Sequence, residues 1–168
     1  MSVVMKTTTP FVLEDVLVTA LTKVGAEPEL VTSELMGGRQ RNQLQIGDIL
    51  TNRRDYNGRQ LFRFEQNRWI LMHDSDEYIV NSGSRFGDRR YTAVARFLAN
   101  VGNEYNIAYQ QYLDAQAEEK RIRLEEERKQ RVESIRQQAI AKARAQGYAV
   151  KEGLNSKGQI QLVLTRMV

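Results

Sequence analysis

A stretch of 43 residues, Glu104–Gln146, contains no glycine and no proline and is rich in charged side chains. This composition predicts a single long helix, about 65 Å in length at 1.5 Å per residue. A compact body built from the other residues, about 125 of them, measures only about 30–35 Å across. The predicted helix must therefore protrude, bend near its polar middle, or carry the end of the chain into a second subunit of a domain-swapped dimer.

The polar middle of this segment, Gln116–Arg131, has almost no apolar stripe, but its charges are ordered. Acids precede bases by four residues, and each such pair adds about 0.2–0.5 kcal/mol to a helix. High helix propensity adds to this, so the segment needs little packing to stay helical. It lacks the heptad repeat of a coiled coil. We expect a solvated helix that can act as a docking arm, supported by Glu119–Arg123, Glu125–Lys129 and Glu127–Arg131.

The N-terminal part predicts a strand followed by a helix. Val3–Thr8 is rich in β-branched residues and predicts the strand. Thr9 suits an N-cap, Pro10 the first helical position and Gly25 the position after the helix. The apolar spacing between them predicts a helix over 10–24 with one buried stripe.

The middle of the chain predicts further short strands and a second helix. Gln66-Asn67 predicts the turn of a hairpin. Asp88 predicts the N-cap of the second helix, which either kinks or splits at Gly102-Asn103. We expect strands at 29–33, 44–50 (interrupted near Gly47-Asp48), 60–64, 69–73, 78–80, 148–151 and 159–165, and turns at 52–58.

Together these elements predict the α+β class. We expect an antiparallel sheet of about five or six strands, packed by one short helix and one long charged C-terminal helix, with a β-hairpin at the end. The expected organisation is an α+β body over 1–115, a charged helical extension over 116–146 and a hairpin over 147–168 that completes the body, as one domain.

Residue types needed for common catalytic sites are scarce. The chain has no cysteine and one histidine, His73, and it contains no phosphate-binding glycine motif. Nucleophile–base pairs built on cysteine or on two histidines are therefore unavailable. Asp74, Asp76 and Glu77 lie close in sequence but do not fit a calcium loop. We expect no enzyme activity, no catalytic residue, no cofactor and no metal site, with His73 in a solvated loop.

Arginines are the main candidates for partner contacts. The net charge is +4, which permits contact with nucleic acid or with an acidic protein surface. Tyr56, Phe62 and Trp69 lie near several arginines, and basic groups interleaved with aromatic rings can bind single strands. In the alternative interpretation the aromatic rings form the core and the arginines are solvated. The candidate contacts are Arg39, Arg41, Arg53, Arg54, Arg59, Arg85, Arg89, Arg90, Arg121, Arg128 and Arg131.

No apolar run approaches the length of about 18 residues needed to cross a membrane, and the first residues do not resemble a secretory signal. With no cysteine, the composition suits a reducing compartment. We therefore expect a cytoplasmic protein without a membrane partner.

Both ends of the chain resemble one family. The matching parts are Met1-Ser2, Thr7 and the 13–25 helix at the start, then 104–109, 146–150 and 158–166 at the end. These resemble the conserved hypothetical frame thirty-five family of plastids and cyanobacteria, which also occurs in other bacteria and in phages. The resemblance implies no catalytic residues. Genes of that family often lie beside one for an AAA+ ATPase, which implies an adaptor or substrate of such a machine.

We therefore expect a non-enzymatic binding or adaptor protein, working with another protein such as an AAA+ ATPase, with a homodimer through the long helix as a further option. The alternative is an RNA- or DNA-binding protein that uses the arginine-rich loops. A small-molecule enzyme has the least support from the sequence.

Overall fold

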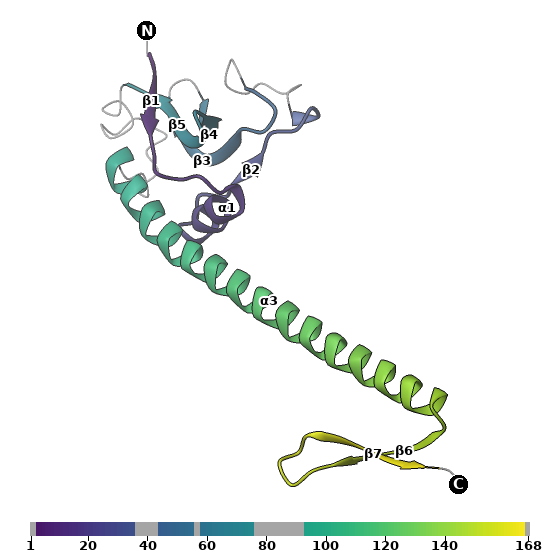
Figure 1. Ribbon diagram of the computed structural model, residues 1–168. Helices are drawn as coiled ribbons and strands as arrows, with labels where there is room; N and C mark the ends of the chain where they lie inside the picture. Colours follow the sequence, from purple (N-terminus) through teal and green to yellow (C-terminus); the bar gives the residue numbers. More distant parts are fainter. Residues whose placement is uncertain (1–2, 36–43, 56–57, 76–92, 167–168) are drawn as a thin grey trace. The chain divides into compact units, whose positions relative to one another are not determined.

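The computed structural model describes residues 3–35, 44–55, 58–75 and 93–166 (Figure 1). The chain divides into two compact units, Met1–Leu113 and Asp114–Val168.

The first unit contains an antiparallel sheet in the order β1-β5-β4-β3-β2. Its central hairpin joins β4 and β5 through Gln66 and Asn67, which both have positive φ values, 52° and 61°. This conformation matches a two-residue turn that follows the twist of the strands, so the predicted hairpin is confirmed. The strands are β1 (Val4–Thr8), β2 (Glu29–Leu30), β3 (Ile49–Asp55), β4 (Gly58–Glu65) and β5 (Arg68–Asp74).

The two faces of this sheet bury different sets of apolar residues, because successive side chains alternate along a strand. One face packs under helix α1 (Glu14–Lys23) and the first turns of helix α3 (Val94–Ala145), and it forms the larger cluster. The other face holds a smaller cluster of Val31, Leu50, Leu61, Ile70 and Met72. The helix-covered cluster includes Phe11, Leu17, Leu21, Ile49, Phe62, Trp69, Leu71, Val94, Phe97, Val101 and Tyr105.

Helix α1 begins four residues later than the sequence predicts, at Glu14 rather than Pro10. The preceding segment is held by other partners. The Thr9 hydroxyl donates to the Trp69 carbonyl, and the Trp69 amide donates to the Phe11 carbonyl, 2.8 Å away. The Tyr105 hydroxyl accepts the amides of Val12 and Leu13, at 3.0 Å each. These bonds keep the backbone extended up to Leu13. Gly25, at φ +75°, follows the helix as predicted.

Helix α3 runs without interruption for 52 residues, so the predicted long helix is confirmed. Gly102 lies inside it and does not split it. Gly147, with φ +83°, follows the end of the helix and accounts for its termination.

The second unit consists of α3 from Asp114 onward and a hairpin of β6 (Tyr148–Leu154) and β7 (Ile160–Arg166). These two strands pair only with each other among the described residues. Glu152 forms an ion pair with Arg136 of α3. Ile140 and Ala143, on the same side of the helix as Arg136, are buried. The hairpin is thus packed against the end of its own helix.

The α+β class, the antiparallel sheet, the short and long helices and the final hairpin are confirmed. Two local predictions are wrong. The predicted strand at 44–50 begins only at Ile49, because residues 46 and 47 form a turn in which the Asp48 carboxylate accepts the Gln45 amide at 2.8 Å. The predicted turn from Asn52 is instead strand β3 up to Asp55, with a register shift between Leu50 and Arg54.

Some predictions lie outside the described residues or are not tested. The expected edge strand at 78–80 and the Asp88 N-cap fall in the undescribed part of the chain. The expected boundaries 1–115, 116–146 and 147–168, and a hairpin that completes the body, stay predictions.

Candidate functional site

The middle of α3 is exposed along its whole circumference. Every residue from Gln111 to Ile135 is exposed, including the aliphatic residues Ile122, Leu124 and Val132. A helix packed on a core buries one stripe, so an exposed stretch of this length has no intramolecular packing role. From Asp114 onward, this exposed stretch belongs to the second unit and is open to a partner.

Ion pairs along the helix replace the missing packing. Glu118 pairs with Arg121 at 2.7 Å, Glu125 with Lys129 at 2.9 Å and Glu133 with Arg136 at 2.9 Å. Of the three predicted pairs, only Glu125–Lys129 is observed. Within residues 93–166, Glu119–Arg123 and Glu127–Arg131 are not joined, while pairs spaced by three residues occur instead.

These contacts shift the pKa values of the groups concerned. The hydrogen bond from Arg121 lowers the pKa of Glu118, and the bond from Lys129 lowers that of Glu125. Bonds from Gln137 and then Arg136 lower the pKa of Glu133. The charged forms are therefore favoured at neutral pH, which keeps the ion pairs formed.

Positive charge is concentrated in the second unit. Residues 114–168 contain 12 lysines and arginines against 8 acids, which equals the net charge of +4 of the whole chain. Two of these acids, Glu133 and Glu152, both bind Arg136. A partner that approaches this unit therefore meets a surplus of cations.

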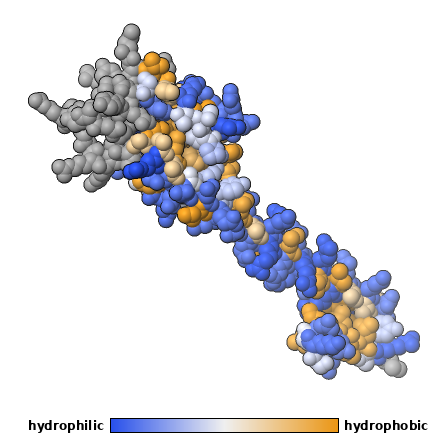
Figure 2. Space-filling view, turned by 90° about the vertical axis from the view of Figure 1, so that its left-hand side faces the viewer, coloured by the Kyte–Doolittle hydropathy of each residue, from blue (hydrophilic) through white to orange (hydrophobic). Residues whose placement is uncertain are grey.

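The hairpin adds exposed apolar side chains. Cross-strand partners share a face, and the pairs Val150–Leu164 and Leu154–Ile160 lie on the same face as Glu152, which binds α3. Leu154 is nevertheless 72 % exposed and Ile160 51 %. Figure 2 shows apolar side chains gathered over this end of the second unit. The hairpin face is thus only partly covered by its own helix.

The arginines of the first unit are largely engaged in internal contacts. Arg53 lies over the Phe97 ring, 4.3 Å from its centroid, and its Nε donates to the Gln60 side chain. Arg59 pairs with Glu29 at 2.5 Å and donates to the Thr51 carbonyl. Arg54 is exposed beside Arg59 in the ladder. Glu27 and Glu29 line the same open cavity, of about 460 Å³, as Arg54 and Arg59, so its charge is mixed.

The other candidate arginines divide into two groups. Arg121, Arg128 and Arg131 are exposed on α3, and of these Arg121 pairs with Glu118. The remaining candidates, Arg39, Arg41, Arg85, Arg89 and Arg90, lie outside the described residues.

The aromatic residues expected to interleave with arginine belong to the core. Phe62 and Trp69 are buried, and Tyr56 lies outside the described residues. A buried ring cannot stack on a base. Phe62 and Trp69 therefore cannot serve as the aromatic platform that single-stranded nucleic acid uses, whereas Phe64, Tyr109 and Tyr112 of the same unit are exposed.

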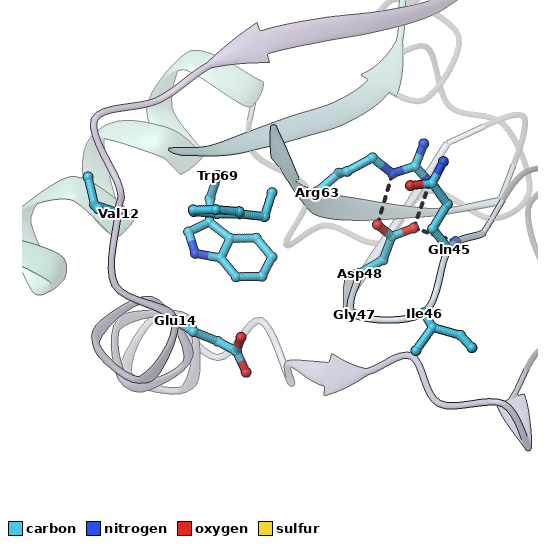
Figure 3. A pocket seen from close by; sticks show the side chains of 9 residues that line it. Val12, Glu14, Gln45, Ile46, Gly47, Asp48, Arg63 and Trp69 are labelled. Atoms are coloured by element: carbon cyan, nitrogen blue, oxygen red, sulfur yellow. Dashed lines mark hydrogen bonds and ion pairs between the residues drawn. The ribbon is translucent and has the colours of Figure 1, made fainter. Parts of the chain in front are cut away.

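A second cavity, of about 330 Å³, lies beside Trp69 (Figure 3). On one wall, Arg63 binds Asp48 through two bonds, 2.9 Å from Nε to Oδ1 and 2.6 Å from the terminal nitrogen to Oδ2. The hydrogen bond with Asp48 raises the pKa of Arg63. Phe64 packs on Trp69, with ring centroids 5.3 Å apart. The Trp69 indole nitrogen has no hydrogen-bond partner in the described structure.

Sequence reasoning missed the Arg63–Asp48 pair. Both side chains are buried, yet they are 15 residues apart and no motif links them. The one available signal was an arginine inside a buried apolar strand, since such a charge requires a partner.

His73 was expected in a solvated loop, and this prediction is wrong. It is buried in β5, where Nε2 lies 2.8 Å from the Thr7 hydroxyl and Nδ1 lies 2.8 Å from the Asp74 carbonyl. Both ring nitrogens are occupied by internal contacts. Asp76 and Glu77 lie outside the described residues.

No cluster of three or more His, Asp or Glu side chains suited to a metal ion occurs in residues 3–35, 44–55, 58–75 and 93–166. In the same part of the chain, no helix combines the length and apolar character required to cross a membrane.

Comparison with known proteins finds no matching family model, no similar curated protein and no similar solved structure. The resemblance to the conserved hypothetical frame thirty-five family therefore stays a prediction.

Proposed function

We propose that this chain is a non-enzymatic binding protein that acts as an adaptor, with the exposed part of α3 as its contact surface. The observation that supports this most strongly is the unbroken exposure of residues 111–135 on a helix held by its own ion pairs. A segment without intramolecular packing contributes little to the stability of the chain itself. Its length and order are accounted for if another protein packs on it.

The finer proposal is that the partner is an AAA+ ATPase. It rests on the family resemblance alone and is a matter of analogy. Binding to nucleic acid is the second candidate, supported by the cationic surplus of residues 114–168 and the exposed Arg54.

The test alters the exposed helix surface in two variants. In the first variant the eleven residues 117–127 become an alanine-rich helical sequence, which keeps the helix length. In a second variant the same segment is deleted, which removes close to three full turns and keeps the helical phase. Partners are quantified by mass spectrometry after affinity purification from cells of the source organism.

We expect both variants to lose the partner that the full chain enriches. Trp69 is the only tryptophan and is buried in the first unit, so unchanged Trp69 fluorescence confirms that this unit stays folded. Retention of the same partner at undiminished yield by the replacement variant would contradict the proposal.

A further inference from the structure

Four cations of α3 gather on one side of the helix, whereas most of its acids lie on the other side, together with Lys129, Arg136 and Arg144. At 3.6 residues per turn, eight residues of the second unit fall in a sector of about 80°, and Gln138 is the one uncharged polar residue among them. We call this sector the cationic stripe. Its aliphatic members are Ala117, Leu124 and Ile135, and its cations are Lys120, Arg128, Arg131 and Lys142.

The cationic stripe is open to a partner. All eight side chains are exposed, with Leu124 at 53 % and Ile135 at 60 %. None of the four cations has an ion pair among the described residues. The hairpin packs on another side of the helix, through Arg136, so it leaves the stripe uncovered.

Most acids lie on the opposite side. Glu118, Glu119, Glu125, Glu126 and Glu133 fall within a sector of about 120° centred opposite the stripe. Glu118, Glu125 and Glu133 form the ion pairs described above. Glu127 is the one acid that borders the stripe.

We infer that the cationic stripe receives an acidic amphipathic helix of a different protein. This inference rests on the proposed adaptor function and names its surface and the chemistry of its partner. Leu124 and Ile135 are eleven residues apart, a spacing that keeps both on one face of a helix. A partner helix with aliphatic residues at matching intervals and flanking Asp or Glu would cover the aliphatic residues and pair the four cations.

Charge opposes a second copy of the chain in this place. A symmetric contact between two copies brings the same patch against itself, so the four cations would face four cations. Contact between the stripe of one copy and the acidic side of another would be heterologous, and it would bring the stripe against Lys129, Arg136 and Arg144 as well as against the acids.

The side-chain chemistry also opposes two other occupants. The stripe has no aromatic residue on which a base could stack. Its two large aliphatic residues bury too little area to hold a helix in a membrane interface, where a broad apolar face is required. An acidic protein helix uses both the aliphatic and the cationic members.

The test compares two neighbouring aliphatic positions on opposite sides of α3. A photo-cross-linking amino acid replaces Leu124 on the stripe or Ile122 on the acidic side, where Ile122 is 47 % exposed. The full-length chain is irradiated in cells of the source organism, and the cross-linked peptides are sequenced by mass spectrometry. Each probe is then combined with Arg131→Glu or with the matched control Arg123→Glu, which changes the net charge equally but lies off the stripe.

The inference predicts a cross-link from position 124 to a peptide of another protein with more acids than bases. Position 122 should give at least about fivefold less of this product. Arg131→Glu should reduce the yield at 124 by at least about fivefold, whereas Arg123→Glu should change it less than twofold.

Several outcomes would overturn the inference. The inference is contradicted by equal cross-link yields from both positions or by a basic target peptide. It is also contradicted by cross-links to the chain itself, to nucleic acid or to lipid. If another protein is captured equally from both positions, the proposed adaptor function is retained, and only the assignment of the cationic stripe as its contact surface is rejected. If no other protein is captured from either position, the proposed adaptor function is rejected as well.

Discussion

At the residue scale, the most consequential contact of the first unit is the buried pair of Arg63 and Asp48. Asp48 also accepts the Gln45 amide, so one carboxylate both stabilises the turn and pairs with the buried Arg63 guanidinium. Burial makes such a pair costly to break, because the remaining charge has lost its water and its partner.

We predict that Asp48→Ala lowers the free energy of unfolding by about 3 kcal/mol. The matched control is Glu65→Ala, which removes the exposed ion pair with Lys6 and should cost less than about 1 kcal/mol. Urea denaturation followed by Trp69 fluorescence measures both. Equal losses in the two variants would show that burial does not determine the strength of the Arg63 pair.

The Tyr105 hydroxyl is a second single-residue contact with a measurable effect. It accepts the amides of Val12 and Leu13 and so joins α3 to the start of α1. Tyr105→Phe leaves these two donors without an acceptor and should cost about 1–2 kcal/mol. Tyr109→Phe, on an exposed ring that stacks on Tyr105, is the control and should be nearly neutral. A Tyr105→Phe variant as stable as the unchanged chain would contradict the stabilising role of these two hydrogen bonds.

At the element scale, α3 depends on ionised glutamates. The hydrogen bonds that Glu118, Glu125 and Glu133 accept in the folded helix lower their pKa values below the ordinary value of about 4.3. A lowered folded pKa gives stabilisation that is present above the unfolded pKa and is lost as the pH falls through the folded value.

We therefore predict that the helical signal of the chain falls on acidification below about pH 4. Circular dichroism at 222 nm measures this, with high salt at neutral pH as a second way to weaken the same pairs. A triple variant with glutamine at positions 118, 125 and 133 should have a weaker signal at neutral pH and a smaller pH dependence. Identical acid profiles for both chains would contradict the role of these pairs.

Elements with local signals could be predicted from the sequence. The Gln66-Asn67 turn, the end of α1 at Gly25 and the part of α3 from Glu104 onward follow from neighbouring residues, and the structure confirms them. The start of α1 could not be predicted, because Trp69 and Tyr105 compete for its first residues from distant parts of the chain. The cationic stripe could also be predicted from the sequence, because a helical projection of 117–142 places its residues on one side.

At the scale of the whole molecule, the two units have separate cores. Ile140 and Ala143 are the buried apolar residues of the second unit in the described structure, whereas Trp69 lies in the core of the first unit. A hairpin of two strands has little stability without a helix to pack on.

We predict that Ile140→Ala destabilises the second unit alone, by about 2–4 kcal/mol. Amide hydrogen exchange of β6 and β7 should accelerate, while the Trp69 fluorescence transition of the first unit should not move. Ile135→Ala, at an exposed position of the same helix, is the control and should change neither signal by more than about 0.5 kcal/mol. A shift of the Trp69 transition by Ile140→Ala would show that the units unfold together.

The central claim, that one side of the exposed part of α3 binds another protein, is tested most directly by spin labels at positions 124 and 122. In the purified chain both labels should be mobile, since both side chains are about half exposed. On addition of extract from the source organism, the label at 124 should become immobilised while the label at 122 stays mobile. Immobilisation at 124 in the purified chain, or no change at 124 with extract, would contradict the account.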